Sequence, residues 1–268
     1  MNKICGLVTI VGSSNVGKST LINRILGHKI SITSRHRLTT RKQIIGIKTT
    51  GNIQMIYLDT PGVLKKDYKQ YNQIWINAIN IADCVIVVID RMYWNIEEHI
   101  LFKHLKKINI SIIIVINKID WIKNKQILLP WLKKIYKKIK CSEIIPISAK
   151  LGIGIKELES IIISHLPKNS HCFPAYKKTD QNKSFLIAEL IREKIIKKLH
   201  SEIPYFINVK LEKIINTFKI IHIYALIIVK RNSQKHIILG IIKKICIEAR
   251  IAIENIFNKK IMLKIWVK

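Results

Sequence analysis

The feature that most constrains the fold is the stretch GSSNVGKS, Gly12–Ser19, which lies between a short apolar run and an amphipathic segment. It is a complete GxxxxGK[ST] pattern, which needs a strand before it and a helix after it. Its two glycines let the backbone turn successive N–H groups toward phosphate oxygens, and the helix N-terminus adds positive potential. Lys18 would supply the charge on the β and γ phosphates. The predicted phosphate-contacting residues are Gly12, Asn15, Val16, Gly17, Lys18, Ser19 and Thr20.

Short apolar runs alternate with amphipathic segments from residue 4 to about residue 167. Runs such as CVIVV and SIIIVI are continuously apolar, which is typical of strands buried on both faces, and the segments between them have helical spacing. This alternation predicts an α/β domain over residues 1–167, with a mostly parallel sheet and helices on both faces. The remaining length is enough for a second domain.

Residues 168–183 are polar and irregular, and we interpret them as a linker. Residues 184–268 predict a helix, two strands, a helix and a last strand, which together form a small α+β domain. Within this domain we expect QKHIILG, residues 234–240, to be a strand that passes through Gly240 into a basic helix.

Cysteine usage and hydropathy indicate the compartment. The five cysteines are scattered without a CxxC pair, which favours reduced thiols. No apolar run is long enough to span a bilayer, and the N-terminal stretch does not resemble a signal peptide. These features predict a cytoplasmic protein.

The polar stretch NKID, Asn117–Asp120, follows a predicted buried strand, at the sheet edge where ligands of this architecture bind. Asp120 can accept hydrogen bonds from the ring N–H and the exocyclic amine of guanine, whereas adenine presents the opposite polarity. Asn117 can meet the base oxygen and neighbouring loops, and the stem of Lys118 can pack along the base. A second base-contacting loop is expected at Ser148, Ala149 and Lys150.

The stretch DTPG, Asp59–Gly62, ends another predicted strand. Asp59 can hold Mg²⁺ through a water, Ser19 can offer its hydroxyl to the same ion, and the Gly62 N–H can contact the γ-phosphate. Thr39 and Thr40 are both candidates for the second metal-sensing hydroxyl, and we favour Thr40. The motifs together predict a switch that binds GTP or GDP with Mg²⁺. Its candidate catalytic residues are Lys18, Thr40, Asp59 and Gly62, and Thr60 and Pro61 complete the nucleotide-contacting set.

The net charge of +30 permits a nucleic-acid partner without demonstrating one. The basic excess is spread over both predicted domains, and the chain uses Ile, Lys and Asn throughout. Basicity that follows from overall composition and basicity that serves RNA binding both remain open interpretations.

Read in order, these motifs resemble the Era family of bacterial GTPases, within the wider TrmE-Era class. The matching stretches are NVGKSTLIN, GHKISITSR, TTR, YLDTPG, NKID, IPISAK, HLP, EIPY, IEAR and WVK, which cover nearly the whole length. The resemblance implies a GTPase domain followed by a KH domain that binds the 3′ end of 16S rRNA, and a role in assembly of the 30S ribosomal subunit. It also implies peripheral association with the inner membrane. We expect a monomer.

The resemblance also bears on two positions of the nucleotide site. Val63 stands where many GTPases place a Gln that orients water, and Era-like proteins share this replacement, so slow intrinsic hydrolysis is expected. Asn15 matches a family position that can help to hold a potassium ion. The alternative is that Asn15 only stabilises the turn of the loop.

The region similar to a KH domain departs from the family pattern. A KH domain clamps RNA with a GxxG loop, whereas here only Gly240 remains and the stretch before IEAR is about four residues short. One interpretation is that Lys243, Lys244 and Arg250 still hold RNA by charge, with less sequence discrimination. The other is that RNA binding is lost. We favour residual RNA binding.

The leading hypothesis is therefore a GTP-hydrolysing assembly factor that binds RNA through its C-terminal region. The alternative is a GTP-gated RNA-binding module or a membrane-surface module, with weak hydrolysis and without RNA sequence specificity.

Overall fold

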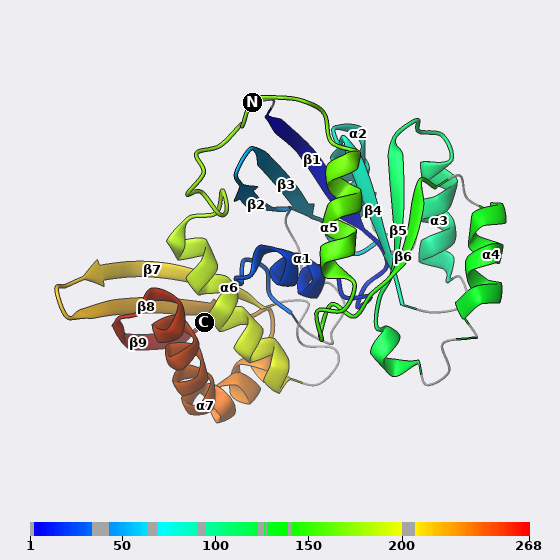
Figure 1. Ribbon diagram of the computed structural model, residues 1–268. Helices are drawn as coiled ribbons and strands as arrows, with labels where there is room; N and C mark the ends of the chain where they lie inside the picture. The colour runs from blue at the N-terminus through cyan, green and yellow to red at the C-terminus, as the bar shows by residue number, and fades with distance from the viewer. Residues whose placement is uncertain are drawn as a thin grey trace. The chain divides into compact units, whose positions relative to one another are not determined.

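The computed structural model describes residues 3–33, 43–63, 69–90, 95–122, 126, 128–138, 141–199 and 207–268 (Figure 1). Its contacts divide the chain into two units. The first comprises Met1–Ser31 and Arg37–Asp180, and the second comprises Ile32–His36 and Gln181–Lys268. Each unit has a hydrophobic core of its own.

The first unit contains a six-stranded sheet in the order β2-β3-β1-β4-β5-β6. Its strands are β1 (Ile4–Val11), β2 (Ile44–Thr50), β3 (Ile53–Asp59), β4 (Cys84–Ile89), β5 (Ser111–Ile116) and β6 (Glu143–Pro146). Every neighbouring pair is parallel except β2 with β3. The prediction of a mostly parallel sheet is confirmed.

Helices cover both faces of this sheet (Figure 1). One face carries α1 (Lys18–Leu26) and α5 (Ile155–Ser164), and the other carries α2 (Lys69–Asn80), α3 (Ile96–Leu105) and α4 (Leu128–Lys138). On the second face, Trp75, Leu101 and Trp131 pack with strand residues such as Val87 and Ile114, which are fully buried. The strands are continuously apolar because the helices exclude water from the side chains on both of their faces.

Strand β2 is a strand that the sequence analysis does not name. The stretch IIGIKTT contains a glycine and two threonines and has no clear alternation. Its partner is set by the turn at Gly51 and Asn52, which pairs Thr50 with Ile53 and runs β2 antiparallel to β3. Gly51 has a φ of 57°, a value suited to a two-residue hairpin turn. The Gly-Asn pair between two apolar stretches is the signal that could have predicted the hairpin.

The polar segment after α5 is bonded to the first unit up to Asp180. The fully buried Gln54 of β3 accepts hydrogen bonds from the backbone N–H groups of Cys172 and Phe173, both at 2.9 Å, and its Nε2 donates to the Phe173 carbonyl at 2.8 Å. Further along, the Ile47 N–H donates to the Lys178 carbonyl at 2.8 Å. The segment interpreted as a linker is therefore bonded to β3 and β2 between Cys172 and Lys178, and the division between units falls after Asp180.

The second unit packs two helices on one face of a three-stranded sheet. Its elements are α6 (Lys183–Lys198), β7 (Asn208–Asn216), β8 (Ile220–Ile228), α7 (Asn232–Phe257) and β9 (Lys260–Val267). The sheet order is β7-β8-β9, with β7 antiparallel and β9 parallel to β8. The predicted order of helix, two strands, helix and strand is confirmed.

Residues 234–240 are helical, which corrects the prediction of a strand there. Helix α7 continues without a break through Gly240. Its buried residues recur at helical spacing, whereas a strand would bury every second residue. They are Gln234, Ile238, Ile245, Ala249 and Ile253. Gly240 therefore lies in a helix interior, and residues 232–257 contain no loop that could act as a GxxG clamp.

Candidate nucleotide-binding site

The phosphate loop leaves β1 after Val11 and enters α1 at Lys18. Gly12 has a φ of 150°, and a Cβ atom there would lie 2.3 Å from the Val88 carbonyl oxygen. Gly17 has a φ of 100°, and a Cβ atom there would lie 2.2 Å from Asn117 Nδ2. Both contacts are impossible for a side chain, which explains the two glycines of the motif. Between them, Val16 is buried, and Thr20 follows half-buried in α1.

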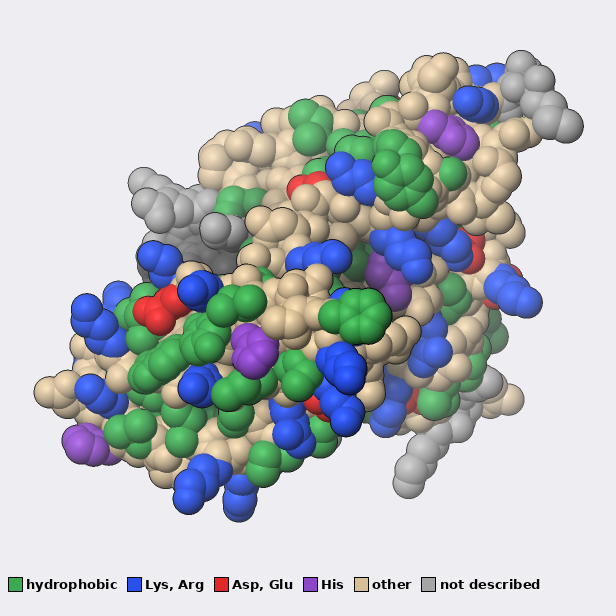
Figure 2. Space-filling model, turned by 90° about the vertical axis from the view of Figure 1, so that its left-hand side faces the viewer, with side chains coloured by type: hydrophobic (Ala, Val, Ile, Leu, Met, Phe, Trp, Pro, Cys, Tyr) green, Lys and Arg blue, Asp and Glu red, His purple; other side chains and the backbone are tan. Residues whose placement is uncertain are grey.

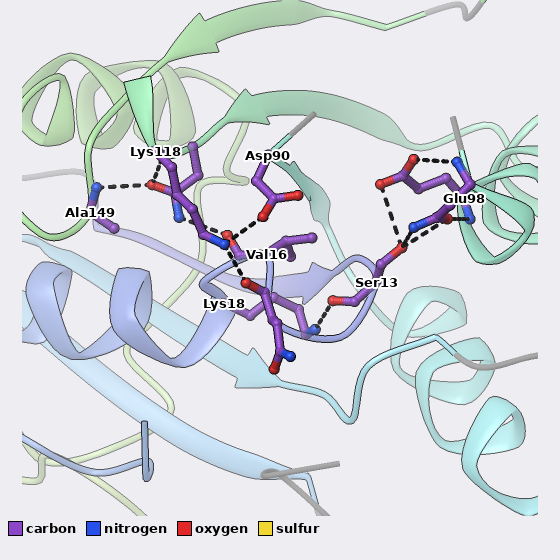
Figure 3. A network of polar contacts seen from close by, with 10 residues as sticks. Ser13, Val16, Lys18, Asp90, Glu98, Lys118 and Ala149 are labelled. Atoms are coloured by element: carbon purple, nitrogen blue, oxygen red, sulfur yellow. Dashed lines mark hydrogen bonds and ion pairs between the residues drawn. The ribbon is translucent and has the colours of Figure 1, made fainter. Parts of the chain in front are cut away.

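The Lys18 side chain is buried and lies across the loop. Its Nζ donates to the Ser13 carbonyl oxygen at 2.8 Å (Figure 3). It also donates to the Gly12 carbonyl oxygen at 3.0 Å. Burial lowers the pKa of Lys18 to about 8, although the carboxylates of Asp59 and Asp90 act in the opposite direction. A phosphate bound in the loop would supply the countercharge that favours the protonated form.

Asp59, at the end of β3, brings two hydroxyl groups together beside the loop. Its Oδ2 accepts from Ser19 Oγ at 2.9 Å and from Ser31 Oγ at 2.6 Å. Hydroxyl and carboxylate oxygens suit Mg²⁺, which takes few protein ligands and fills its shell with water and phosphate oxygens. The donor set of Ser19 and Asp59 therefore fits a magnesium ion held together with a nucleotide.

Motif reasoning missed Ser31, which is almost fully buried at this position. It is held there by Asn23 of α1, whose Oδ1 accepts from the Ser31 N–H at 3.1 Å and whose Nδ2 donates to the Ser31 carbonyl at 2.7 Å. Thr40, the favoured second metal-sensing hydroxyl, and Thr39 lie outside the described residues.

The DTPG turn packs directly against the phosphate loop. The buried Thr60 donates from Oγ1 to the Ile10 carbonyl at 2.7 Å, and Pro61 is also buried. A Cβ atom at Gly62 would lie 2.6 Å from Ser14 Oγ, so only glycine fits against the loop. The Val63 N–H donates to the Gly12 carbonyl at 3.1 Å, while the Val63 side chain is fully buried in the core. An apolar side chain in that position cannot orient an attacking water.

Asn117 connects three loops that are far apart in the sequence (Figure 3). Its Nδ2 donates to the Val16 carbonyl at 2.8 Å, and its Oδ1 accepts from the Lys118 N–H at 2.8 Å and the Ala149 N–H at 3.0 Å. The phosphate loop, the NKID stretch and the SAK stretch therefore meet at the carboxyl end of the parallel strands. This is where an open α/β sheet binds its ligands.

Lys118 has a φ of 65° and extends back toward the phosphate loop. Its Nζ donates to the Asn15 carbonyl at 2.7 Å and pairs with Asp90 Oδ2 at 2.5 Å. The same Nζ lies 4.9 Å from the centre of the Trp121 ring. Sequence reasoning missed Asp90, although it ends a buried strand at the same sheet edge as Asp59 and Asn117.

The carboxylate expected to read guanine is held in place while remaining exposed. Asp120 Oδ1 accepts from the buried Ser148 Oγ at 2.6 Å. The SAK stretch is fixed in turn by Arg24 of α1, which donates to the carbonyl oxygens of Ala149, at 3.1 Å, and Lys150. The structure thus brings together the described residues that the motifs nominate for the base.

Two residues of the phosphate loop have structural roles that the motifs do not explain. Ser13 Oγ lies 3.2 Å from Asn95 Oδ1 and 3.5 Å from Glu98 Oε1, the two residues that cap the start of α3 (Figure 3). Asn15 has a φ of 68°, a conformation that Asn tolerates better than most residues. The turn itself therefore gives one reason for an asparagine at this position.

The residues nominated for RNA binding all lie on α7. Gly240, Lys243, Lys244 and Arg250 are exposed there. Basic side chains are not confined to this helix: Figure 2 shows Lys and Arg spread over one side of the molecule, with hydrophobic side chains gathered between them. Among the described residues, none of the helices is long and apolar enough to cross a membrane.

A sequence profile of the family described as 50S ribosome-binding GTPase matches residues 7–118. GTPase Era of Pseudomonas fluorescens Pf-5 is 45% identical, over 98% of this chain and 91% of that protein. GTPase Era of Pseudomonas putida W619 is 43% identical over the same shares.

Among solved structures, Era in complex with MgGDPNP and nucleotides 1506–1542 of 16S ribosomal RNA superposes with a TM-score of 0.95. It is 35% identical, and the match covers 99% of this chain and 93% of that one. A variant of Aquifex aeolicus Era bound to GDP and AlF4⁻ gives a TM-score of 0.94 at 35% identity. With a relative 45% identical along nearly its whole length, the chain belongs to the GTPase Era family and is a GTPase.

Proposed function

We propose that the first unit binds GTP or GDP with Mg²⁺ at the loops joined by Asn117 and hydrolyses GTP there. We further propose that the second unit binds the 3′ end of 16S rRNA during assembly of the 30S ribosomal subunit. The observation that carries the proposal is the likeness to Era bound to MgGDPNP and 16S ribosomal RNA, since it covers 99% of this chain and so includes both units.

The contacts in the first unit support a role for each part of the site. The phosphates would lie over the backbone between Gly12 and Ser19, with Lys18 moving from its carbonyl partners onto them. Ser19 and Asp59 would hold the ion that neutralises the phosphates, with Thr40 as the predicted further hydroxyl. Asn117, Asp120 and the SAK stretch would form the guanine site.

The second unit is proposed to act as a modified KH-like domain. Residues 1–167 would be the GTPase domain, residues 168–183 the connection and residues 184–268 the RNA-binding domain. Because α7 is continuous, Lys243, Lys244 and Arg250 would contact RNA from the exposed side of a helix instead of from a loop. This favours contacts with phosphates over discrimination between bases.

The test is a titration of the full chain with a labelled oligonucleotide from the 3′ end of 16S rRNA and with a scrambled control, each with GDP and with a non-hydrolysable GTP analogue. We expect the analogue-bound chain to prefer the true sequence by a small factor, because the α7 contacts favour phosphates over bases. If the affinities for both oligonucleotides are equal and decrease together as the salt concentration rises, the chain binds RNA by charge alone, without sequence specificity. Absence of binding to either would remove RNA from the function and leave the nucleotide site.

The full chain also serves to test four further expectations: stimulated hydrolysis, potassium binding, membrane association and a monomeric state. Turnover of GTP with and without 30S subunits separates an assembly factor from a module with weak hydrolysis. Turnover in potassium and in sodium buffers tests the ion proposed at Asn15, since a turn-stabilising role predicts equal rates. Sedimentation with anionic vesicles, without RNA, tests the peripheral association with the inner membrane, and sedimentation of the chain alone tests whether it is a monomer.

A further inference from the structure

One face of the sheet in the second unit is not covered by the helices of that unit. Along β8, Ile221, Ile223, Ala225 and Ile227 are buried in the core with α6 and α7. Because side chains alternate along a strand, the residues between them, including Tyr224 and Leu226, lie on the opposite face. These are only partly buried.

The neighbouring strands place lysines and an aromatic ring beside them. Tyr224 is paired with Lys213 of β7 and with Lys264 of β9. Leu226 is paired with Lys210 of β7 and Trp266 of β9. Paired residues on adjacent strands share a face of the sheet. We call this set the open sheet face: Lys210, Lys213, Tyr224, Leu226, Lys264 and Trp266.

Two aromatic rings lie next to each other on the open sheet face. The rings of Tyr224 and Trp266 are stacked, with centres 5.9 Å apart and planes 16° apart. Lys264 Nζ lies 5.9 Å from the centre of the Tyr224 ring. Trp266 is 45% exposed, which is a large fraction for the largest apolar side chain.

The charge on this face indicates the kind of partner. Three lysines surround the rings, and the one carboxylate beside them on β7 is Glu212, at the β-bulge between Leu211 and Lys213. An apolar protein partner would gain from the rings but would have to desolvate the ammonium groups. Single-stranded nucleic acid uses both features, because its bases stack on aromatic rings and its phosphates pair with lysines.

We propose that the open sheet face is a contact site for single-stranded RNA, with a base stacked on Trp266 and phosphates held by Lys210, Lys213 and Lys264. The inference rests on the proposed RNA binding and adds a second surface to it. The helices lie on the other face of the sheet, so this site does not share residues with the exposed side of α7.

The test compares variants of the full chain for affinity to a labelled single-stranded RNA at moderate salt. Trp266→Leu keeps an apolar side chain but removes the stacking ring, and we expect its Kd to rise about tenfold. Trp266→Phe keeps a ring and should stay within about threefold of the parent chain. Lys264→Gln should weaken binding and reduce its salt dependence by about one phosphate contact. The matched control is Tyr176→Leu, which removes an aromatic ring that is 84% exposed in the first unit.

The results separate this inference from the proposed function. If the parent chain binds no single-stranded RNA, both fail. If the parent chain binds RNA, and Lys243→Ala with Lys244→Ala weakens binding while Trp266→Leu does not, only the open sheet face is wrong. Equal losses in Trp266→Leu and Trp266→Phe would show a structural role instead of stacking and would overturn the inference. So would a dimer of the parent chain that Trp266→Leu converts to monomer, because the face would then be occupied by a second copy.

Discussion

At the scale of single residues, the buried ammonium group of Lys18 makes nucleotide binding sensitive to pH. Its pKa of about 8 in the folded chain lies below the ordinary 10.5, because burial disfavours the charged form. Below about pH 8 the group is charged in both the folded and the unfolded chain, and its burial destabilises the fold. As pH rises from 8 toward 10.5 the folded form loses its proton first, and this destabilisation is relieved.

A bound phosphate favours the charged form of Lys18 and so raises its pKa. We therefore expect GDP binding to take up more protons at pH 8.5 than at pH 7. Affinity should be full below about pH 8 and should decrease above it, by up to about tenfold per pH unit. Calorimetry in two buffers of different ionisation enthalpy measures the uptake. The control is Lys18→Arg, whose charge persists and whose uptake should not increase. Equal uptake by the parent chain at both pH values would contradict the pKa shift.

At the scale of elements, Gly240 in α7 lies in a helix, although the sequence around it predicts a loop. A glycine after an apolar run suggests a loop, but here it lies inside a 26-residue helix. Glycine in a helix interior costs about 0.5 to 1 kcal/mol relative to alanine, because its unfolded backbone has more freedom. A Cβ atom at Gly240 would meet no heavy atom within 4 Å.

We therefore expect Gly240→Ala to stabilise the second unit by about 0.5 to 1 kcal/mol. Chemical denaturation of the full chain, followed by helix content, measures the change. Gly62→Ala is the opposite control, because a Cβ atom there would lie 2.6 Å from Ser14 Oγ and should destabilise the phosphate loop. A loss of stability in Gly240→Ala would mean that residue 240 needs a backbone conformation that only glycine adopts, as a clamp loop would.

At the scale of the whole molecule, the net charge of +30 predicts that RNA affinity depends strongly on salt. Each phosphate contact on a single strand contributes a slope of about −0.7 in a plot of log affinity against log salt. We expect a steep slope for true and scrambled oligonucleotides alike, with their ratio little changed. Replacing Lys243 and Lys244 by Gln should flatten the slope, whereas replacing Lys103 and Lys106 by Gln, on the first unit, should not. Equal flattening by both pairs would show that charge acts without a defined RNA surface.

Local sequence was enough to predict much of the site and most of the elements. The continuously apolar strands marked the parallel sheet, and the glycines, Lys18, Asp59, Asn117 and Asp120 marked the loops at its carboxyl edge. This works because a phosphate loop needs particular residue types at a fixed spacing, and because burial on both faces leaves a strand few polar choices.

Tertiary structure alone decided where neighbouring segments meet. Ser31 is hydrogen-bonded to Asp59, and Lys118 to Asp90. In each pair the two residues are 28 positions apart, and no local sequence pattern predicts such contacts. Strand β2 depends on a partner strand, and the stretch before Gly240 is apolar enough for a strand or a helix. Packing against the three-stranded sheet settled the second case, because helical burial of Ile238 and Ile245 fills the core, whereas an alternating strand would have exposed half of the apolar residues.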